Sequence, residues 1–395
     1  MLRRYRRYIA LLAFGLLATP LVVGIVRPDG PESILKEGRT LARAPKAPGS
    51  GDDWLALPRE TDAYLRDHFG LREILIRAHK DVTRPLLGFG NDSVLIGRDG
   101  RMFYLGEETV RQSAGLLVRD QRVADATDML VRMNEELRAR GIRFLVASPP
   151  NGATIYQDDL PRWAQNRGKP TEYDLLLANL AAKGAPAVDL RPSVKKARAA
   201  EGPVFYMHDT HWTFRGALAA YNAIVEADSH PEWRIDPSFA LGPMTLRNGG
   251  DLARMFGVGD TVSEQAEDLT LPHGEKVLHS SDPFGDFTVT SENAGPTILI
   301  LGDSFTGGYL PAMILQHAHR VIWMDHKSCG FDWDEVEKYR PDEVWWMPNE
   351  RFLVCKPGLK PRGLPESKVD SAEGRAPAGL AAQVDAAGDR DGGRE

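Results

Sequence analysis

The stretch Thr297-Ile298-Leu299-Ile300-Leu301-Gly302-Asp303-Ser304-Phe305-Thr306 decides the fold. Its first five residues are apolar or β-branched and stop at a glycine, the pattern of a short strand buried on both faces. A helix is expected to follow, through about residue 318. Ser304 therefore lies where a buried strand gives way to a helix, and α/β folds place functional groups at the carboxyl ends of such strands. The alternative is that Ser304 only caps the helix.

Strands and helices alternate along most of the chain. The expected strands are 142–147, 187–190, 204–207, 297–301, 320–324 and 343–347. The expected helices are 119–139, 172–182, 191–200, about 214–225, 304–318 and 333–339. This alternation predicts an α/β fold with a mostly parallel sheet covered by helices on both faces. Residues 228–295 show no clear period, and we interpret them as an irregular insertion or a small β substructure.

The N-terminus bears on the compartment. Four arginines within residues 3–7 precede an uncharged, mostly apolar run from Tyr8 to Val26. At about 1.5 Å of rise per residue this run just crosses a hydrocarbon core of roughly 30 Å. We expect a retained transmembrane anchor with its arginine-rich end in the cytoplasm; a cleaved signal peptide is the alternative. Both interpretations put the rest of the chain outside the cytoplasm.

Composition excludes some functions and leaves one question open. With a net charge of −6 over 395 residues, the chain gives no support for a nucleic-acid partner. Cys329 and Cys355 lack the spacing and number of zinc ligands. They follow two adjacent expected strands, so either a disulfide or two buried thiols is compatible with the sequence. Residues 358–395, rich in Gly, Ala, Pro and charge, are expected to form a disordered tail.

A second motif, Asp209-Thr210-His211-Trp212, supplies what a serine nucleophile needs. A hydroxyl is a weak nucleophile near neutral pH and needs a base, and the base needs a carboxylate to fix its tautomer. We therefore predict a triad of Ser304, His211 and Asp209, with Trp212 shielding one side from solvent. A metal site at His208–His211 is the alternative, but no third ligand has suitable spacing, so we expect no metal.

At these residues the chain resembles the alginate O-acetyltransferase family of exported SGNH-hydrolase-like proteins. Gly302-Asp303-Ser304-Phe305 is similar to the SGNH nucleophile block, and the Asp-x-His-Trp block precedes the serine, as in that family. Further blocks resemble the family in the same order between residues 37 and 353; they are 37–42, 67–72, 96–103, 149–151, 250–252 and 350–351. The sequence departs from the pattern at Thr210, where relatives are often histidine-flanked, and at Gly152, where many carry lysine.

The resemblance implies an SGNH-hydrolase-like three-layer sandwich. We divide the chain into a cytoplasmic stub and anchor (1–30), a linker and N-terminal family segment (31–105), a catalytic domain (106–357) and the tail. Within the site, the Ser304 amide is expected to donate to an oxyanion. Asn151 is a second candidate donor, and both Asn151 and Trp212 are expected to contact substrate. No cofactor is expected.

The function that follows is acetylation of a cell-surface or secreted polysaccharide by an inner-membrane protein whose catalytic domain lies in the periplasm. The expected partners are the polysaccharide acceptor and, by the resemblance, a membrane-bound O-acyltransferase that delivers the acetyl group. Two other functions remain open. One is a carbohydrate or lipid esterase that uses the same triad. The other is a non-catalytic subunit of a polysaccharide export complex.

Overall fold

The computed structural model describes residues 44–49, 51–67, 90–279 and 285–365, together with residues 8, 12, 14, 15, 18 and 19. Within these residues, no helix combines the length and the apolarity that a bilayer crossing requires. The expected anchor falls almost wholly outside the described residues. The described N-terminal part contains the helix α3 (Gly51–Asp67).

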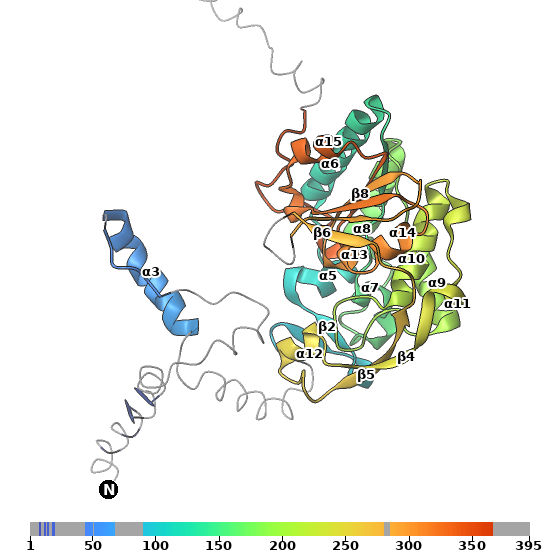
Figure 1. Ribbon diagram of the computed structural model, residues 1–395. Helices are drawn as coiled ribbons and strands as arrows, with labels where there is room; N and C mark the ends of the chain where they lie inside the picture. The colour runs from blue at the N-terminus through green and yellow to red at the C-terminus, as the bar shows by residue number, and fades with distance from the viewer. Residues whose placement is uncertain are drawn as a thin grey trace, which may run out of the picture.

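A six-stranded sheet organises the remaining chain, with strand order β3-β10-β8-β9-β7-β6 (Figure 1). β3, β10, β8 and β9 run parallel to one another. At one edge, β7 runs antiparallel to β9, and β6 runs antiparallel to β7. The sheet is therefore mixed, with a parallel centre as expected. Its strands are β3 (Arg143–Val146), β6 (Glu275–Leu278), β7 (Phe287–Thr290), β8 (Thr297–Gly302), β9 (Arg320–Asp325) and β10 (Glu343–Met347).

Helices cover both faces of this sheet. The helices of the described region after α3 are α5 (Thr109–Ser113), α6 (Asp120–Ala139), α7 (Gly152–Ile155), α8 (Glu172–Ala182), α9 (Arg191–Glu201), α10 (Phe214–Ala227), α11 (Pro237–Ala240), α12 (Asp251–Phe256), α13 (Ser304–Gly307), α14 (Leu310–Ile314) and α15 (Trp333–Tyr339). α6, α8 and α15 pack on one face, and α9, α10 and α14 on the other.

The two faces come from strict alternation along β8. Leu299 and Leu301 enter the core with α6 and α8, whereas Ile298 and Ile300 enter the core with α10. All four are fully buried, as the apolar run predicts for a central strand. This layering positions the carboxyl end of β8, where the chain continues into Asp303 and Ser304.

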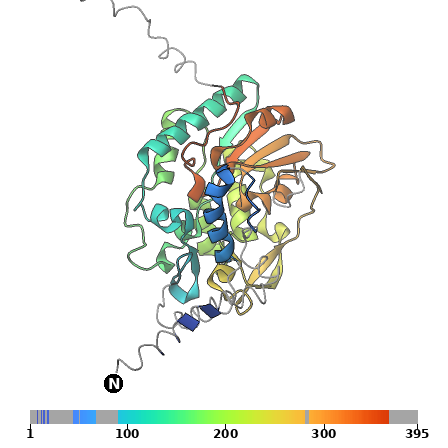
Figure 2. The same cartoon turned by 90° about the vertical axis from the view of Figure 1, so that its left-hand side faces the viewer.

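A smaller substructure lies at one end of the molecule in both views (Figures 1 and 2). It contains the hairpin β1 (Val94–Ile96) and β2 (Met102–Tyr104), the antiparallel ribbon β4 (Leu241–Asn248) and β5 (Ser263–Leu269), and helix α12. Val94 and Met102 share a small core with Leu252 and Phe256 of α12. Residues 97–101 connect the two antiparallel strands β1 and β2.

Two expected strands are wrong. Of residues 187–190, only Ala187 pairs with the sheet, through a single bridge to Val146 of β3. Of residues 204–207, only Phe205 forms a bridge, and its partner is Trp212 rather than a strand of the main sheet. Short apolar runs satisfy the pattern of a strand, but pairing depends on neighbours that the run itself does not specify.

One expectation left two alternatives, and two others need correction. For residues 228–295 the second alternative, a small β substructure, agrees with the β4–β5 ribbon, whereas β6 and β7 of the same segment belong to the main sheet. The helix expected over 304–318 is divided into α13 and α14, with Pro311 in the first turn of the second. Residues 358–365 are not part of a disordered tail, since Arg362 exchanges backbone hydrogen bonds with Phe331 and Trp333. The remainder of the predicted tail, 366–395, lies outside the described residues.

The two cysteines form a disulfide, which settles the question that the sequence left open. Cys329 lies in a short 3-10 turn after β9, and Cys355 lies after the 3-10 helix η6 (Glu350–Phe352) that follows β10. The bond therefore links the loops that follow two strands of the sheet.

Candidate active site

The nucleophile block is held by Asp303. Its carboxylate accepts a hydrogen bond from the Phe305 amide at 3.0 Å, which caps α13, and a second from the Asn349 amide at 2.7 Å. The side chain is 9% exposed. Asp303 thus fixes the start of α13 and ties it to the loop after β10, while Ser304 itself is exposed.

The base stands on a narrow loop between Phe205 and Trp212. The two ends of this loop are joined by backbone hydrogen bonds from Tyr206 to His211 at 3.3 Å and from Thr213 to Val204 at 3.0 Å. Thr213 then caps α10 through its hydroxyl, which accepts from the Gly216 amide. The loop therefore presents Asp209 and His211 from the start of a well-packed helix.

The structure brings the three predicted triad residues together. The Ser304 hydroxyl donates to His211 Nε2 at 2.9 Å, and His211 Nδ1 donates to Asp209 Oδ1 at 2.7 Å. Because a carboxylate only accepts, this contact fixes the proton of neutral His211 on Nδ1 and leaves Nε2 free to accept the serine proton. The geometry is that of an activated serine.

Asp209 remains ionised although it is buried. Burial alone would raise its pKa, but hydrogen bonds and charge from His211, together with the charge of Arg247, hold the pKa well below the usual aspartate value. The second oxygen of the carboxylate accepts from Arg247 Nη2 at 2.9 Å and from the Asp251 amide at 3.2 Å. A charged partner is thus maintained beside the His211 imidazole.

Arg247 and Asp251 were not predicted as site residues. Both belong to the segment that the sequence shows without a clear period, and the only signal was the Gly250-Asp251-Leu252 block. Gly250 is required there, since its φ is +152° and a Cβ would lie 2.0 Å from the His208 carbonyl oxygen. This close approach lets α12 begin directly beneath the loop that carries the base.

Asp251 forms a second acidic contact around the base. It accepts hydrogen bonds from the amide and hydroxyl of Thr210, and its Oδ2 lies 3.6 Å from His211 Nδ1. Burial and the charge of Asp209 raise the pKa of Asp251. Asp251 therefore fixes the loop through Thr210, whereas Asp209 makes the shorter contact with the imidazole.

Asp251 also supplies the third potential metal ligand that the sequence spacing did not reveal. Asp209, His211 and Asp251 form one group of possible ligands within the described residues, and Asp228, His230 and Glu343 form another. In the first group, Arg247 and backbone amides already occupy the Asp209 oxygens. In the second, the Arg143 guanidinium contacts both Glu343 and His230.

Trp212 occupies a different place from the one expected. It is fully buried, and its indole N–H donates to the Phe305 carbonyl oxygen at 3.0 Å. A glycan cannot contact it there, which corrects its assignment to substrate binding. The Phe305 ring lies between the indole at 5.7 Å and the His211 imidazole at 4.9 Å. Trp212 therefore joins the loop of the base to the helix of the nucleophile.

Asn151 lies beside the site but does not reach the nucleophile. Asn151 is 2% exposed. Its backbone N–H donates to Glu350 Oε2 at 2.7 Å, and its side-chain Nδ2 lies 3.4 Å from Ser113 Oγ. Among the described residues, no hydrogen bond joins Asn151 to Ser304. Its role as an oxyanion donor or substrate contact stays a prediction.

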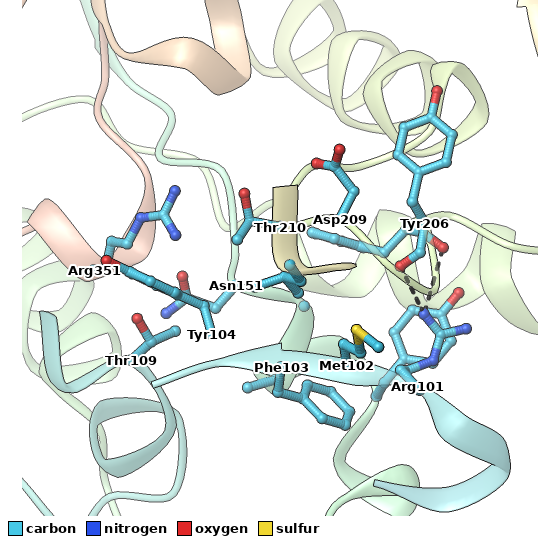
Figure 3. A pocket seen from close by; sticks show the side chains of 15 residues that line it. Arg101, Met102, Phe103, Tyr104, Thr109, Asn151, Tyr206, Asp209, Thr210 and Arg351 are labelled. Carbon is cyan, nitrogen blue, oxygen red and sulfur yellow. Dashed lines mark hydrogen bonds between the residues drawn. The ribbon is translucent and has the colours of Figure 1, made fainter. Parts of the chain in front are cut away.

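A small cavity lies next to the triad, with a volume of about 20 Å³ (Figure 3). Tyr104, Thr109 and Arg351 line one end of it, and Arg101 lines the other. Arg101 is fixed by a bond to the Tyr206 carbonyl oxygen at 3.0 Å. The volume accommodates about one water molecule. Asp209 and Thr210, the two residues that precede His211 in the chain, also line the cavity.

A central parallel strand that delivers a serine to a histidine–aspartate pair, within a sheet covered by helices on both faces, defines an SGNH-hydrolase-like α/β protein. The chain belongs to the family described as "SGNH hydrolase-like domain, acetyltransferase AlgX", whose model matches residues 94–344. This match covers more than half of the chain and confirms the resemblance found in the sequence.

Relatives with curated names are the probable alginate O-acetylases AlgJ of two pseudomonads. The Pseudomonas aeruginosa protein is 30% identical over 156 residues, which are 40% of this chain and 38% of the relative. The Pseudomonas putida protein is 28% identical over 214 residues, 54% of this chain and 50% of the relative. The chain thus spans at most half the length of these curated relatives.

Among solved structures, the chain is similar to the O-acetyltransferase domain of Pseudomonas putida AlgJ. The identity is 18%, the coverage is 71% of this chain and 98% of that domain, and the TM-score is 0.41. We draw nothing further from a superposition at this TM-score.

Proposed function

We propose that this protein is an extracytoplasmic O-acetyltransferase that acetylates hydroxyls of a polysaccharide of the alginate kind through an acetyl-Ser304 intermediate. The observation that carries the proposal is the pair of contacts that His211 makes. Its Nε2 lies 2.9 Å from Ser304 Oγ, and its Nδ1 lies 2.7 Å from Asp209 Oδ1. Membership of the acetyltransferase family and the names of the two curated relatives support the acyl group and the acceptor.

The first half-reaction loads the serine. Ser304 Oγ attacks the carbonyl carbon of an acetyl donor while its proton moves to His211 Nε2. The tetrahedral intermediate then expels the donor's leaving atom, which takes the proton from His211. Asp209 stays ionised and stabilises the imidazolium throughout, because its pKa is far below that of a free aspartate.

The second half-reaction transfers the acetyl group. An acceptor hydroxyl gives its proton to His211 Nε2 as its oxygen attacks the acetyl carbonyl. Collapse of the second intermediate releases the sugar acetate, and Ser304 Oγ recovers the proton. The Ser304 amide is our candidate oxyanion donor, since it donates no hydrogen bond within the described residues, whereas the Phe305 amide is already bonded to Asp303.

The proposed location is the periplasmic side of the inner membrane. The disulfide supports an oxidising compartment, and the arginine-flanked apolar run at residues 8–26 supports an anchor. Acetyl-CoA is cytoplasmic, so the acetyl group must be delivered across the membrane. The proposed donor partner is a membrane-bound O-acyltransferase, and an anchor would keep the two proteins in one plane.

The test uses the purified full-length protein with a chromogenic acetyl ester, with and without an alginate oligosaccharide. Mass spectrometry follows acetyl groups on Ser304 and on the sugar. We expect Ser304→Ala to abolish both products, whereas Ser238→Ala, which removes another exposed serine hydroxyl, leaves them intact.

The outcomes separate the competing functions. Serine-dependent acetylation of the sugar establishes the transferase. Serine-dependent ester cleavage, with no acetyl sugar from any acceptor, makes the protein an esterase with the same triad. Equal activity in wild type and Ser304→Ala removes the triad from the function, and no activity in either with several acetyl donors leaves a non-catalytic subunit.

A further inference from the structure

Arg351 lies among three aromatic rings beside the nucleophile helix. Its Cζ is 5.2 Å from the centroid of the Tyr104 ring, 5.3 Å from that of Phe305 and 5.4 Å from that of Phe352. Its backbone is fixed by Asn349 Oδ1, which accepts from its amide at 3.3 Å, and Gln112 Nε2 donates to its carbonyl oxygen at 3.4 Å. The guanidinium is thus held in one place by packing.

This guanidinium differs from the other arginines of the site in having no acidic partner. Arg101 pairs with Asp159 at 3.0 Å and Arg247 with Asp209 at 2.9 Å. Within the described residues Arg351 forms no ion pair, since the Asp209 carboxylate that lines the same cavity is paired with Arg247, and the Nε atom of Arg351 is buried without a hydrogen-bond acceptor. A partly buried cation without a counter-charge is costly, and an anionic ligand would remove that cost.

The position of Arg351 relates it to the reacting groups. Both Arg351 and the base contact the Phe305 ring, since Arg351 Cζ lies 5.3 Å and the His211 ring 4.9 Å from its centroid. Phe305 directly follows Ser304. A ligand group on Arg351 is therefore within one sugar residue of the site where an acceptor hydroxyl must meet His211.

The cavity that Arg351 lines selects a small group. Its volume of about 20 Å³ suits a small polar group rather than the whole sugar ring that carries it. A planar carboxylate can accept two parallel hydrogen bonds from a guanidinium, the geometry in which arginine binds carboxylates most strongly. Asn151 and Thr210 line the same cavity and give it a polar wall.

We propose that Arg351 binds the carboxylate of an acidic sugar residue in the acceptor chain and thereby positions a neighbouring hydroxyl of that chain at His211. This inference rests on the proposed transferase function and assigns its acceptor specificity to one residue. Arg351 is then a substrate-binding residue, and neutral glycans are poorer acceptors because they leave its charge unpaired.

The first experiment measures binding without an acetyl donor, so that it is independent of transfer. The ligands are an unacetylated alginate tetrasaccharide and the same tetrasaccharide with its carboxyl groups reduced to CH2OH, titrated by calorimetry at constant ionic strength. Wild type is expected to bind the acidic form about 10- to 100-fold more tightly. Arg351→Gln is expected to bind the two forms alike. Arg351→Lys is expected to keep part of the difference, because lysine carries the charge without the fork.

The matched control is Arg254→Gln, which makes the same charge change at an exposed position of α12 outside the cavity lining. The proposal is overturned if wild type binds both ligands equally or binds neither. It is also overturned if Arg351→Gln keeps the wild-type preference, or if Arg254→Gln reduces the preference as much, which would indicate general charge attraction. Because the wild-type comparison needs no variant, the test survives a failure of Arg351→Gln to fold.

A transfer experiment distinguishes this proposal from the proposed function. With the chromogenic ester as donor, Arg351→Gln should raise KM for the acidic acceptor by about 10-fold or more. Absence of transfer by wild type to any glycan would defeat the transferase function alone. A fall in kcat that is equal for acidic and neutral acceptors would instead make Arg351 a donor to the oxyanion and defeat the carboxylate proposal.

Discussion

Arg247 Nη2 lies 2.9 Å from the Asp209 oxygen that does not face His211. The carboxylate is therefore held between a permanent cation and the catalytic base. The Arg247 guanidinium also lies 3.9 Å from the centroid of the Tyr206 ring, which limits its movement. A triad carboxylate needs to stay charged although burial removes its hydration. The positive charge of Arg247 compensates for that lost hydration.

Arg247→Met should therefore lower kcat by about 10-fold and leave KM for the acetyl ester nearly unchanged. Without the cation, the pKa of Asp209 rises and its contact with His211 weakens. Arg247→Lys should recover part of the rate. The measurement is a kcat and KM determination at several pH values. Equal rates for Arg247→Met and wild type would show that His211 alone keeps Asp209 charged.

Asp209→Asn should reduce kcat by about 10³-fold or more, because an amide cannot fix the tautomer of His211 or stabilise its cation. It should also lower stability in a pH-dependent manner. The folded-state pKa of Asp209 is below its unfolded value near 3.8, so its contribution is complete above that pH and is lost as the pH falls through the folded-state pKa.

Urea unfolding of wild type and Asp209→Asn checks this dependence. The difference in unfolding free energy should be constant from about pH 5 to pH 8 and narrow below about pH 4. A difference that widens in acid would contradict the assignment of the low pKa to Asp209.

Trp212→Phe should destabilise the protein by about 1–3 kcal/mol, since the buried Phe305 carbonyl loses its donor. It should also lower kcat, because that bond joins the loop of the base to the helix of the nucleophile. Trp163→Phe is the control; its ring is 61% exposed, so its effect should stay within about 0.5 kcal/mol. Thermal unfolding with parallel kinetics provides both readouts. Equal effects of the two substitutions would remove this structural role from Trp212.

Replacement of both cysteines by serine should cost about 3–4 kcal/mol of unfolding free energy. The disulfide closes a segment whose ends are 26 residues apart, and loop-closure entropy gives this magnitude. Guanidinium unfolding of wild type with and without reductant, beside the double variant, measures it. Reductant should leave the unfolding free energy of the double variant unchanged. A decrease there would mean that reductant destabilises the wild type by a route other than breaking this disulfide.

The local sequence pattern predicted the nucleophile and its strand because the residues that specify them are adjacent in the chain. The apolar run ending at Gly302 determines both the burial of β8 and the place of Ser304, and the spacing of Asp209 and His211 suits a direct contact. The same reasoning found most of the helices; in the structure, Thr171 and Thr213 cap α8 and α10.

Tertiary contacts explain what the sequence did not reveal. Arg247 lies 38 residues from Asp209, and no local period marks it, since β4 is half-exposed and its alternation is weak. Trp212 was interpreted as a solvent shield because a large aromatic residue next to a catalytic histidine suits either a surface or a core. Only the position of Phe305 decides between them. Among the described residues Arg351 has aromatic neighbours but no acidic partner, which is a property of the tertiary structure that no local sequence pattern marks.

The ribbon β4–β5 and helix α12, which lie between α10 and β8 in the chain, have a consequence for how this protein can diverge. Arg247 and Asp251 come from that segment, whereas the nucleophile and the base come from the sheet and the loop before α10. The reactivity of His211 is therefore adjusted by a stretch of chain that contributes little to the central sheet between β3 and β9. Substitutions there can change the charges and hydrogen bonds around the Asp209–His211 pair while the scaffold folds as before, so this segment can diverge independently of the central sheet.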